Sequence, residues 1–171
     1  MTSEEVDRAL RRISHEILER HGDVETLAVV GIRTRGVHLA QTVCDFIEEL
    51  AGVRPPLGEL DVTAHRDDRA GDGPVSVETS VPFPVEDATV ILVDDVLYTG
   101  RTVRAGLDAL SELGRPAKIE FAVFVARWHR EIPGEADYVG KCVATATVER
   151  ISVHVPQVDG DAGVWIEKEA V

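Results

Sequence analysis

The hydrophobic positions of the chain follow two spacings, and together these predict an α/β protein. Residues 90–93 are four consecutive apolar residues, three of them β-branched. A run without alternation is typical of a strand buried on both faces of a parallel sheet. Residues 27–32 and 119–125 form similar runs. We therefore predict three central strands.

Other segments repeat apolar residues at helical spacing. The first helix is predicted over residues 3–20, with Thr2 and Glu5 forming a capping box at its start. A second pattern covers 37–50. A third begins after Thr102 and ends at Gly114, a common stop residue.

The remaining strands are shorter. Residues 57–65 read as one strand, and the alternating residues 75–81 as a returning strand with one face exposed. Residues 148–155 and 164–166 also alternate, which predicts an antiparallel hairpin across a turn at 159–161.

Composition adds limits to this picture. With 171 residues and 44% hydrophobic content, residues 1–171 suit one globular domain. No apolar run reaches the length of a signal peptide or a membrane span, so we expect a soluble, cytoplasmic protein that does not contact a membrane. Cys44 and Cys142 are too isolated to form a disulfide framework or a metal site, and we interpret both as reduced packing residues.

The net charge of −13 argues against nucleic-acid binding, because such binding needs a concentrated basic patch. It does not exclude it, since the charge on one face decides. Arg8, Arg11 and Arg12 share one face of the first helix. A solvated face is a slightly better interpretation of them than contact with RNA.

Two adjacent acids, Asp94 and Asp95, follow the run 90–93 at the carboxyl end of the predicted strand, where ligands of open α/β sheets bind. The loop 99–102 then leads into a helix, and free backbone N–H groups at a helix N-terminus favour phosphate. Acids that accept hydrogen bonds from a sugar diol or hold hydrated Mg²⁺, beside a phosphate site, fit a ribose 5-phosphate. The alternative is that both acids only cap the helix.

This stretch, VDDVLYTGRTVRAGLDAL, resembles the signature of type I phosphoribosyltransferases for phosphoribosyl pyrophosphate (PRPP). The residues of this stretch are most similar to one branch of these enzymes, the PyrR proteins. PyrR proteins are bifunctional pyrimidine operon regulators and uracil phosphoribosyltransferases. The similarity extends over nearly the whole chain, through RALRRISHEI, GIRTRG, HRDD, VPFPV, LGRPAKI, HREIP and DYVGK.

The resemblance implies a single type I phosphoribosyltransferase domain, a mainly parallel, twisted sheet flanked by helices with a small C-terminal β hood. The implied reaction converts uracil and PRPP to UMP and pyrophosphate with Mg²⁺. The implied partners are PRPP, uracil, UMP, pyrimidine operon leader mRNA and further copies of the chain, in a dimer or tetramer.

The first strand also ends in a loop suited to an anion, GIRTRG, which contains Arg33 and Arg35. Two such loops imply a ligand phosphorylated at both ends, as PRPP is. The alternative is two surface arginines flanking a tight turn. By resemblance this is the pyrophosphate loop, with Thr34, Arg35 and Gly36 nearest the pyrophosphate.

The resemblance also assigns the other site residues. Asp94 and Asp95 hold the ribose diol and, through PRPP, Mg²⁺, and with Arg35 they form the catalytic set. The full predicted substrate site consists of Thr34, Arg35, Gly36, Arg66, Asp94, Asp95, Val96, Leu97, Tyr98, Thr99, Gly100, Arg101, Thr102, Arg127 and Ile151.

Several of these assignments have alternatives. Arg66 opens a charged, Gly-rich stretch to residue 74, which we interpret as a mobile loop that closes over PRPP. The alternative for Arg66 is a purely structural role. His129 is better interpreted as a packed histidine than as a catalyst.

The chain departs from its relatives in two places. Ala126 and Trp128 replace an Asp and a Gly beside Arg127, which leaves a phosphoribosyltransferase for another base as an alternative. The run VATA at 143–146 replaces a segment associated with RNA contact, although Lys141 and Arg150 remain as candidate RNA contacts. An RNA-binding regulator with little catalysis is the competing function.

Overall fold

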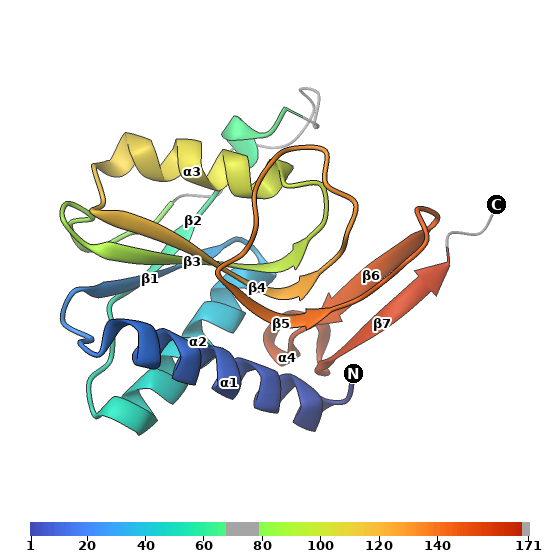
Figure 1. The fold of residues 1–171 in the computed structure, drawn as a ribbon, viewed down its shortest axis with the longest axis horizontal. Helices are drawn as coiled ribbons and strands as arrows, with labels where there is room; N and C mark the ends of the chain where they lie inside the picture. The colour runs from blue at the N-terminus through green and yellow to red at the C-terminus, as the bar shows by residue number, and fades with distance from the viewer. Residues whose placement is uncertain (68–78, 169–171) are drawn as a thin grey trace.

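The computed structural model describes residues 1–67 and 79–168 and has the predicted α/β architecture (Figure 1). Its elements are α1 (Ser3–His21), β1 (Leu27–Ile32), α2 (Arg35–Ala51), β2 (Leu57–Leu60), the 3₁₀ helix η1 (Thr63–His65), β3 (Thr89–Leu97), α3 (Arg101–Leu113), β4 (Lys118–Ala126), β5 (Tyr138–Cys142), β6 (Glu149–His154), α4 (Pro156–Asp159) and β7 (Gly163–Lys168).

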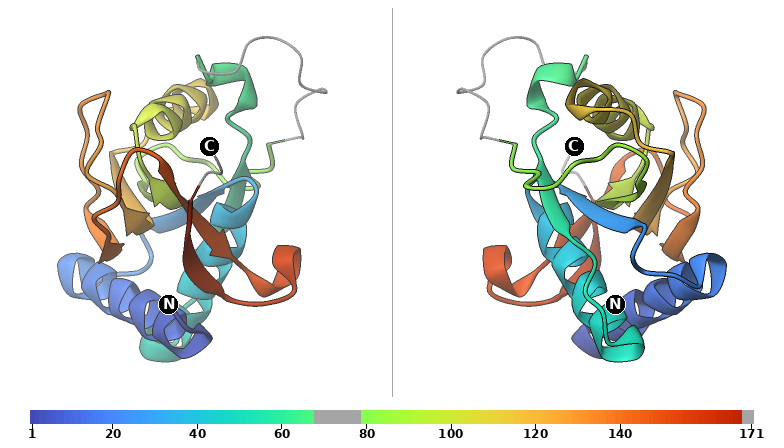
Figure 2. Two further views of the ribbon diagram at one scale, coloured as in Figure 1. Left: turned by 90° about the vertical axis from the view of Figure 1, so that its right-hand side faces the viewer. Right: turned by 90° about the vertical axis from the view of Figure 1, so that its left-hand side faces the viewer.

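Five strands form one parallel sheet in the order β2-β1-β3-β4-β5. Helices α1 and α2 cover one face and α3 covers the other, as both side views show (Figure 2). Every residue of β1 is buried, because both faces of this central strand are covered. The continuous apolar runs in the sequence are therefore explained by two cores, one on each face of the sheet.

The first helix begins as predicted. The hydroxyl of Thr2 accepts a hydrogen bond from the Glu5 backbone N–H, and the Glu5 carboxylate accepts one from the Thr2 backbone N–H. This capping box fixes the start of α1, and Gly22 ends the helix in the left-handed conformation that glycine favours.

The strand predicted over 57–65 is wrong in its second half, because β2 ends at Leu60 and η1 follows. The Asp61 carboxylate accepts hydrogen bonds from the backbone N–H and the hydroxyl of Thr63. This local turn replaces the backbone hydrogen bonds that would continue β2 along the sheet. Of the predicted returning strand 75–81, only residues 79–81 are described, and Ser80 forms an isolated antiparallel bridge with Glu59. Residues 68–78, which include most of the predicted closing loop, lie outside the described residues.

The C-terminal hairpin is confirmed, since β6 and β7 pair antiparallel, but the turn between them contains α4. We call the segment from β6 to β7 the hood. It lies beyond the carboxyl ends of the central strands (Figure 1).

Two details of the edge strand differ from the sequence interpretation. The sequence pattern did not predict β5, whose five residues include a glycine and a lysine. Cys142, at the end of β5, is exposed rather than a packing residue, whereas Cys44 is buried as expected. Within the described ranges, none of the helices is long and apolar enough to cross a membrane.

Candidate active site

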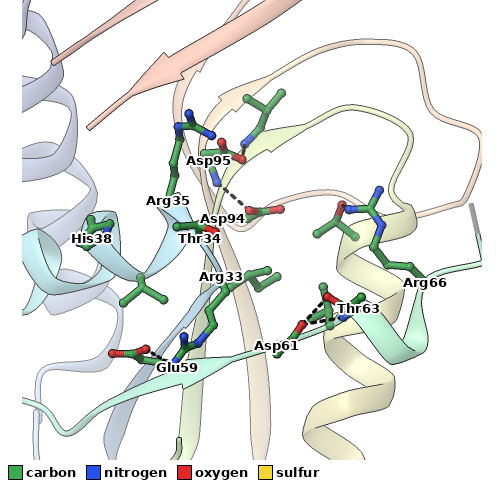
Figure 3. A pocket seen from close by; sticks show the side chains of 15 residues that line it. Arg33, Thr34, Arg35, His38, Glu59, Asp61, Thr63, Arg66, Asp94 and Asp95 are labelled. Carbon is green, nitrogen blue, oxygen red and sulfur yellow. Dashed lines mark hydrogen bonds and ion pairs between the residues drawn. The ribbon is translucent and has the colours of Figure 1, made fainter. Parts of the chain in front are cut away.

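A cavity of about 570 Å³ lies at the carboxyl ends of β1, β2 and β3 (Figure 3). Its size suits a small phosphorylated ligand. It is lined by Ile32, Arg33, Thr34, Arg35, Val37, His38, Glu59, Asp61, Val62, Thr63, Arg66, Asp94, Asp95, Val96 and Thr102. The structure thus brings the predicted acidic pair and the predicted arginine loop to one cavity.

The acidic pair lies inside β3 rather than beyond it, because the strand continues to Leu97. Asp94 is 6% exposed, and its Oδ1 accepts a hydrogen bond from the Asp95 backbone N–H at 2.9 Å. Burial and the neighbouring Asp95 charge raise the pKa of Asp94 well above its ordinary value. The two acids therefore form a crowded site that a sugar diol or a cation would relieve.

The arginine loop lies beside the acids in the cavity wall, because β1 and β3 are neighbouring strands (Figure 3). Arg33 forms an ion pair with Glu59 at 2.6 Å, so its charge is partly used within the protein. Gly36 does not line the cavity. Its position packs against β3, where a Cβ would lie 2.6 Å from the Val93 carbonyl oxygen. Glycine is thus required at position 36 for the packing of α2 on β3.

Arg35, the first residue of α2, lines the cavity and also forms a bidentate ion pair with Asp159 of the hood. Its Nε donates to Oδ2 of Asp159 at 3.0 Å and its Nη2 donates to Oδ1 at 2.6 Å. This ion pair, together with the charge of Asp95, raises the pKa of Arg35.

The second anion loop is only partly in the cavity wall. Thr102 lines the cavity, and its hydroxyl accepts a hydrogen bond from Arg66 Nη1 at 3.2 Å. Leu97, Tyr98, Thr99, Gly100 and Arg101 do not line it. Gly100 has φ +91°, where glycine is favoured, and it directly precedes α3.

Arg101 is bound to other residues of the protein and does not line the cavity. It forms ion pairs with Asp67 at 2.8 Å and Glu131 at 2.9 Å, which hold the start of α3 against the neighbouring loops.

Arg127 lies outside the cavity and is 4% exposed. It donates to the hydroxyl of Thr145 at 2.7 Å and to the carbonyl oxygen of Ala146 at 3.0 Å, and it stacks on the ring of Tyr98. Arg127 therefore supports the loop 98–102 from behind.

Trp128 is 73% exposed. It lines a separate groove of about 520 Å³ together with Arg127, Arg130 and Cys142. This groove does not share lining residues with the cavity at the acidic pair.

The predicted peripheral residues are also placed. Ile151 is buried in the core between the hood and the sheet, and Lys141 and Arg150 are exposed. The three arginines of α1 have acidic partners, Arg8 with Glu4, Arg11 with Glu49 and Arg12 with Glu16. These pairs favour the solvated, structural interpretation of that face.

Several lining residues were not in the predicted site, namely Arg33, His38, Glu59, Asp61 and Thr63. Asp159 was predicted only as part of a turn. Glu59 and Asp61 come from the end of β2, and the rule that ligands bind beyond the carboxyl ends of parallel strands would have indicated them.

Mg²⁺ prefers oxygen ligands and retains several water molecules, so two adjacent carboxylates suit it when a phosphorylated ligand supplies the rest. Among residues 1–67 and 79–168, no group of three or more His, Cys, Asp and Glu side chains could hold a metal ion alone. The residues present therefore fit a Mg²⁺ that arrives with its ligand.

Comparison with known proteins is consistent with this geometry. Residues 2–157 match the family model for the phosphoribosyl transferase domain. The chain is 52% identical over 162 residues to the Bifunctional protein PyrR of Deinococcus radiodurans, covering 94% of this chain and 88% of that protein. It is 48% identical to the Bifunctional protein PyrR of Ligilactobacillus salivarius, covering 94% of this chain and 93% of the relative.

Solved structures agree on the fold. A hypoxanthine phosphoribosyltransferase from Staphylococcus aureus has a TM-score of 0.72 at 15% identity, over 98% of this chain and 89% of that one. One from Trypanosoma cruzi has a TM-score of 0.69 at 18% identity, over 85% and 77%.

Proposed function

We propose that the protein transfers phosphoribose from PRPP to uracil, from the premise that the chain belongs to the PyrR family of phosphoribosyltransferases. One observation carries the proposal. The buried Asp94, its neighbour Asp95 and the arginine loop line one cavity at the carboxyl ends of parallel strands. Acids suit the ribose diol and arginine suits the pyrophosphate, so the cavity has the charges that PRPP requires.

We assign the parts of PRPP to separate elements. Asp94 and Asp95 accept hydrogen bonds from the ribose diol, and Arg35 binds the pyrophosphate. The loop 98–102 binds the 5-phosphate through backbone N–H groups at the start of α3. Arg66 donates a hydrogen bond to Thr102, and both residues line the cavity, so Arg66 is placed beside the assigned phosphate loop.

The chemistry follows from this placement. The bond from C1 of the ribose to the pyrophosphate oxygen breaks, and pyrophosphate leaves with the electron pair. A bond from C1 to the uracil nitrogen forms as that nitrogen releases its proton to solvent. Positive charge develops on the ribose ring in the transition state, as in glycoside chemistry. The carboxylates of Asp94 and Asp95 lie where they stabilise that charge, and Arg35 stabilises the charge that leaves with pyrophosphate.

Bound with PRPP, Mg²⁺ would neutralise part of the pyrophosphate charge, and Asp94 and Asp95 are the residues that would hold it through PRPP. The rest of catalysis is positioning of the two substrates.

A base panel tests the reaction. Uracil, cytosine, hypoxanthine and orotate are each incubated with PRPP and Mg²⁺, and the products are identified by mass. We expect UMP as the main product. If hypoxanthine or another base is the best substrate, the uracil assignment is wrong. The altered residues Ala126 and Trp128 would then be the first candidates for the change in base specificity.

We propose a second activity, UMP-dependent binding of pyrimidine operon leader mRNA, because the curated relatives are named as bifunctional. Lys141 and Arg150 are exposed and available for phosphate contacts.

We also propose that the protein forms a homo-oligomer, a dimer or tetramer. We place it in the cytoplasm, where PRPP and mRNA are present.

A further inference from the structure

The hood reaches the cavity through one side chain. Asp159 is the last residue of α4, the short helix between β6 and β7, and its carboxylate binds Arg35 at the start of α2. The two residues are 124 positions apart in the chain. Asp159 is therefore a direct link between the hood and the loop assigned to pyrophosphate.

The carboxylate of Asp159 is held on both sides. Its Oδ2 accepts from Arg35 Nε at 3.0 Å and from the Val155 backbone N–H at 2.9 Å, while its Oδ1 accepts from Arg35 Nη2 at 2.6 Å. The Asp159 side chain is 13% exposed. These bonds to Arg35 and Val155 lower the pKa of Asp159 to about 2, so the carboxylate is charged at neutral pH.

The contact uses only one edge of the guanidinium group. Arginine has five N–H donors, and a side-on pair through Nε and Nη2 engages two of them. The other edge, with both N–H groups of Nη1 and one of Nη2, is not used by Asp159. Arg35 lines the cavity and its side chain is 35% exposed, so donors that Asp159 does not engage are left for a ligand.

We propose that Asp159 is a positioning residue, which fixes the guanidinium plane of Arg35 so that its remaining edge binds the pyrophosphate of PRPP. This inference rests on the proposed function, because it deepens the assignment of Arg35. The physical reason is preorganisation: a long side chain that is already fixed loses less freedom when the ligand binds. The opposite possibility is that Asp159 competes with pyrophosphate for Arg35.

The test compares Asp159→Asn with Asp161→Asn. Both remove one negative charge from the turn of the hood, but Asp161 contacts His154 instead of Arg35. Binding of inorganic pyrophosphate with Mg²⁺, and of UMP, is measured by calorimetry on each full-length protein. We expect Asp159→Asn to weaken pyrophosphate binding roughly tenfold and to leave UMP binding within about twofold, whereas Asp161→Asn changes neither.

A double-mutant cycle adds a readout that a merely structural role would not change. In an Arg35→Ala background, Asp159→Asn should cause no further loss of pyrophosphate affinity, because the side chain it positions is absent. Tighter pyrophosphate binding in Asp159→Asn would show a competitor and overturn the inference. Equal loss of UMP and pyrophosphate binding would show a general role in holding the hood, and would overturn it as well.

The proposed function and this inference fail in different ways. Pyrophosphate binding needs no base and no turnover, so a wrong base assignment leaves the test intact. A wild-type protein that binds no Mg²⁺–pyrophosphate would overturn both. A wild-type protein that binds it, with an Asp159→Asn variant that binds equally well, would overturn the positioning role alone.

Discussion

Asp94 and Asp95 place two carboxylates side by side in the cavity wall, one of them almost fully buried. Replacing both by asparagine keeps their size and leaves each side chain one acceptor oxygen, but it removes the charges. We expect the variant to lose transfer activity by about a hundredfold or more, because the developing charge on the ribose is no longer stabilised. Turnover with PRPP and uracil measures this, and near wild-type turnover would refute the assigned ribose site.

The same variant has a defined effect on stability. The pKa of Asp94 is raised in the folded protein, so the wild type loses stability as the pH rises from the unfolded value of about 4 towards the folded pKa. We expect the melting temperatures of the variant and the wild type to be similar near pH 4, with the variant higher at pH 7. A variant that melts lower than the wild type at pH 7 would contradict this account.

The two anion loops are predicted to bind different parts of the ligand, which two single substitutions separate. Gly100→Val adds a branched side chain at φ +91°, and its Cβ would lie 3.0 Å from the Ile132 carbonyl oxygen. This distorts the loop assigned to the 5-phosphate, so PRPP and UMP should both bind more weakly. Arg35→Ala removes the pyrophosphate contact and should weaken PRPP alone.

Calorimetric titration of each variant with UMP and with PRPP measures the difference. Equal loss of UMP affinity in Gly100→Val and Arg35→Ala would contradict the division of labour between the loops.

At the scale of elements, Glu120 connects β4 with α1 and β5. Its carboxylate is fully buried and accepts hydrogen bonds from Lys118 and from the hydroxyl of Tyr138, and it pairs with His21. Burial raises the pKa of Glu120, but these hydrogen bonds outweigh burial and lower the pKa to about 2. The carboxylate therefore stabilises the packing of α1 on the edge of the sheet.

We expect Glu120→Gln to lower the free energy of unfolding by about 2–3 kcal/mol at pH 7, the scale of a pKa shift of about two units. Because the folded pKa is depressed, this contribution is present above the unfolded pKa of about 4 and is lost as the pH falls towards 2. Urea denaturation at pH 7 and pH 3 should show the difference between variant and wild type shrinking. Glu19→Gln, an exposed glutamate on α1, is the control and should change little at either pH.

The elements that the sequence predicted well are those with a strong local signal. The capping box at Thr2 and the unbroken apolar run of β1 can be read from neighbouring residues alone, without knowing what packs against them. The end of β2 was missed because the turn at Asp61 depends on a side-chain hydrogen bond to Thr63. Strand β5 was missed because its five residues carry too little pattern, and pairing with β4 determines it.

The site shows the same division. The placement of Asp94, Asp95 and Arg35 at one cavity was predictable, because each follows an apolar run that predicts a parallel strand. The contact between Arg35 and Asp159 joins residues 124 positions apart, and no local pattern indicates such a pair. The buried position of Arg127 also depends on the loop around Thr145, which the sequence does not place.

For the whole molecule, the question is how a chain with a net charge of −13 would bind RNA. Phosphate contacts need local positive charge, and the arginines of α1 are paired with glutamates. Lys141 of β5 and Arg150 of β6 are exposed candidates. We therefore expect weak binding to a leader hairpin from the protein's own pyrimidine operon, enhanced by UMP and highly sensitive to salt.

Titrations of the leader hairpin and a scrambled hairpin, at two salt concentrations with and without UMP, measure this directly. Lys141→Ala and Arg150→Ala should each lower the slope of log affinity against log salt by roughly one, because each removes one phosphate contact. Arg8→Ala, whose side chain is paired with Glu4, should leave the slope unchanged. If the two hairpins bind equally well, or UMP makes no difference, the RNA activity is absent from this chain and the transferase reaction stands alone.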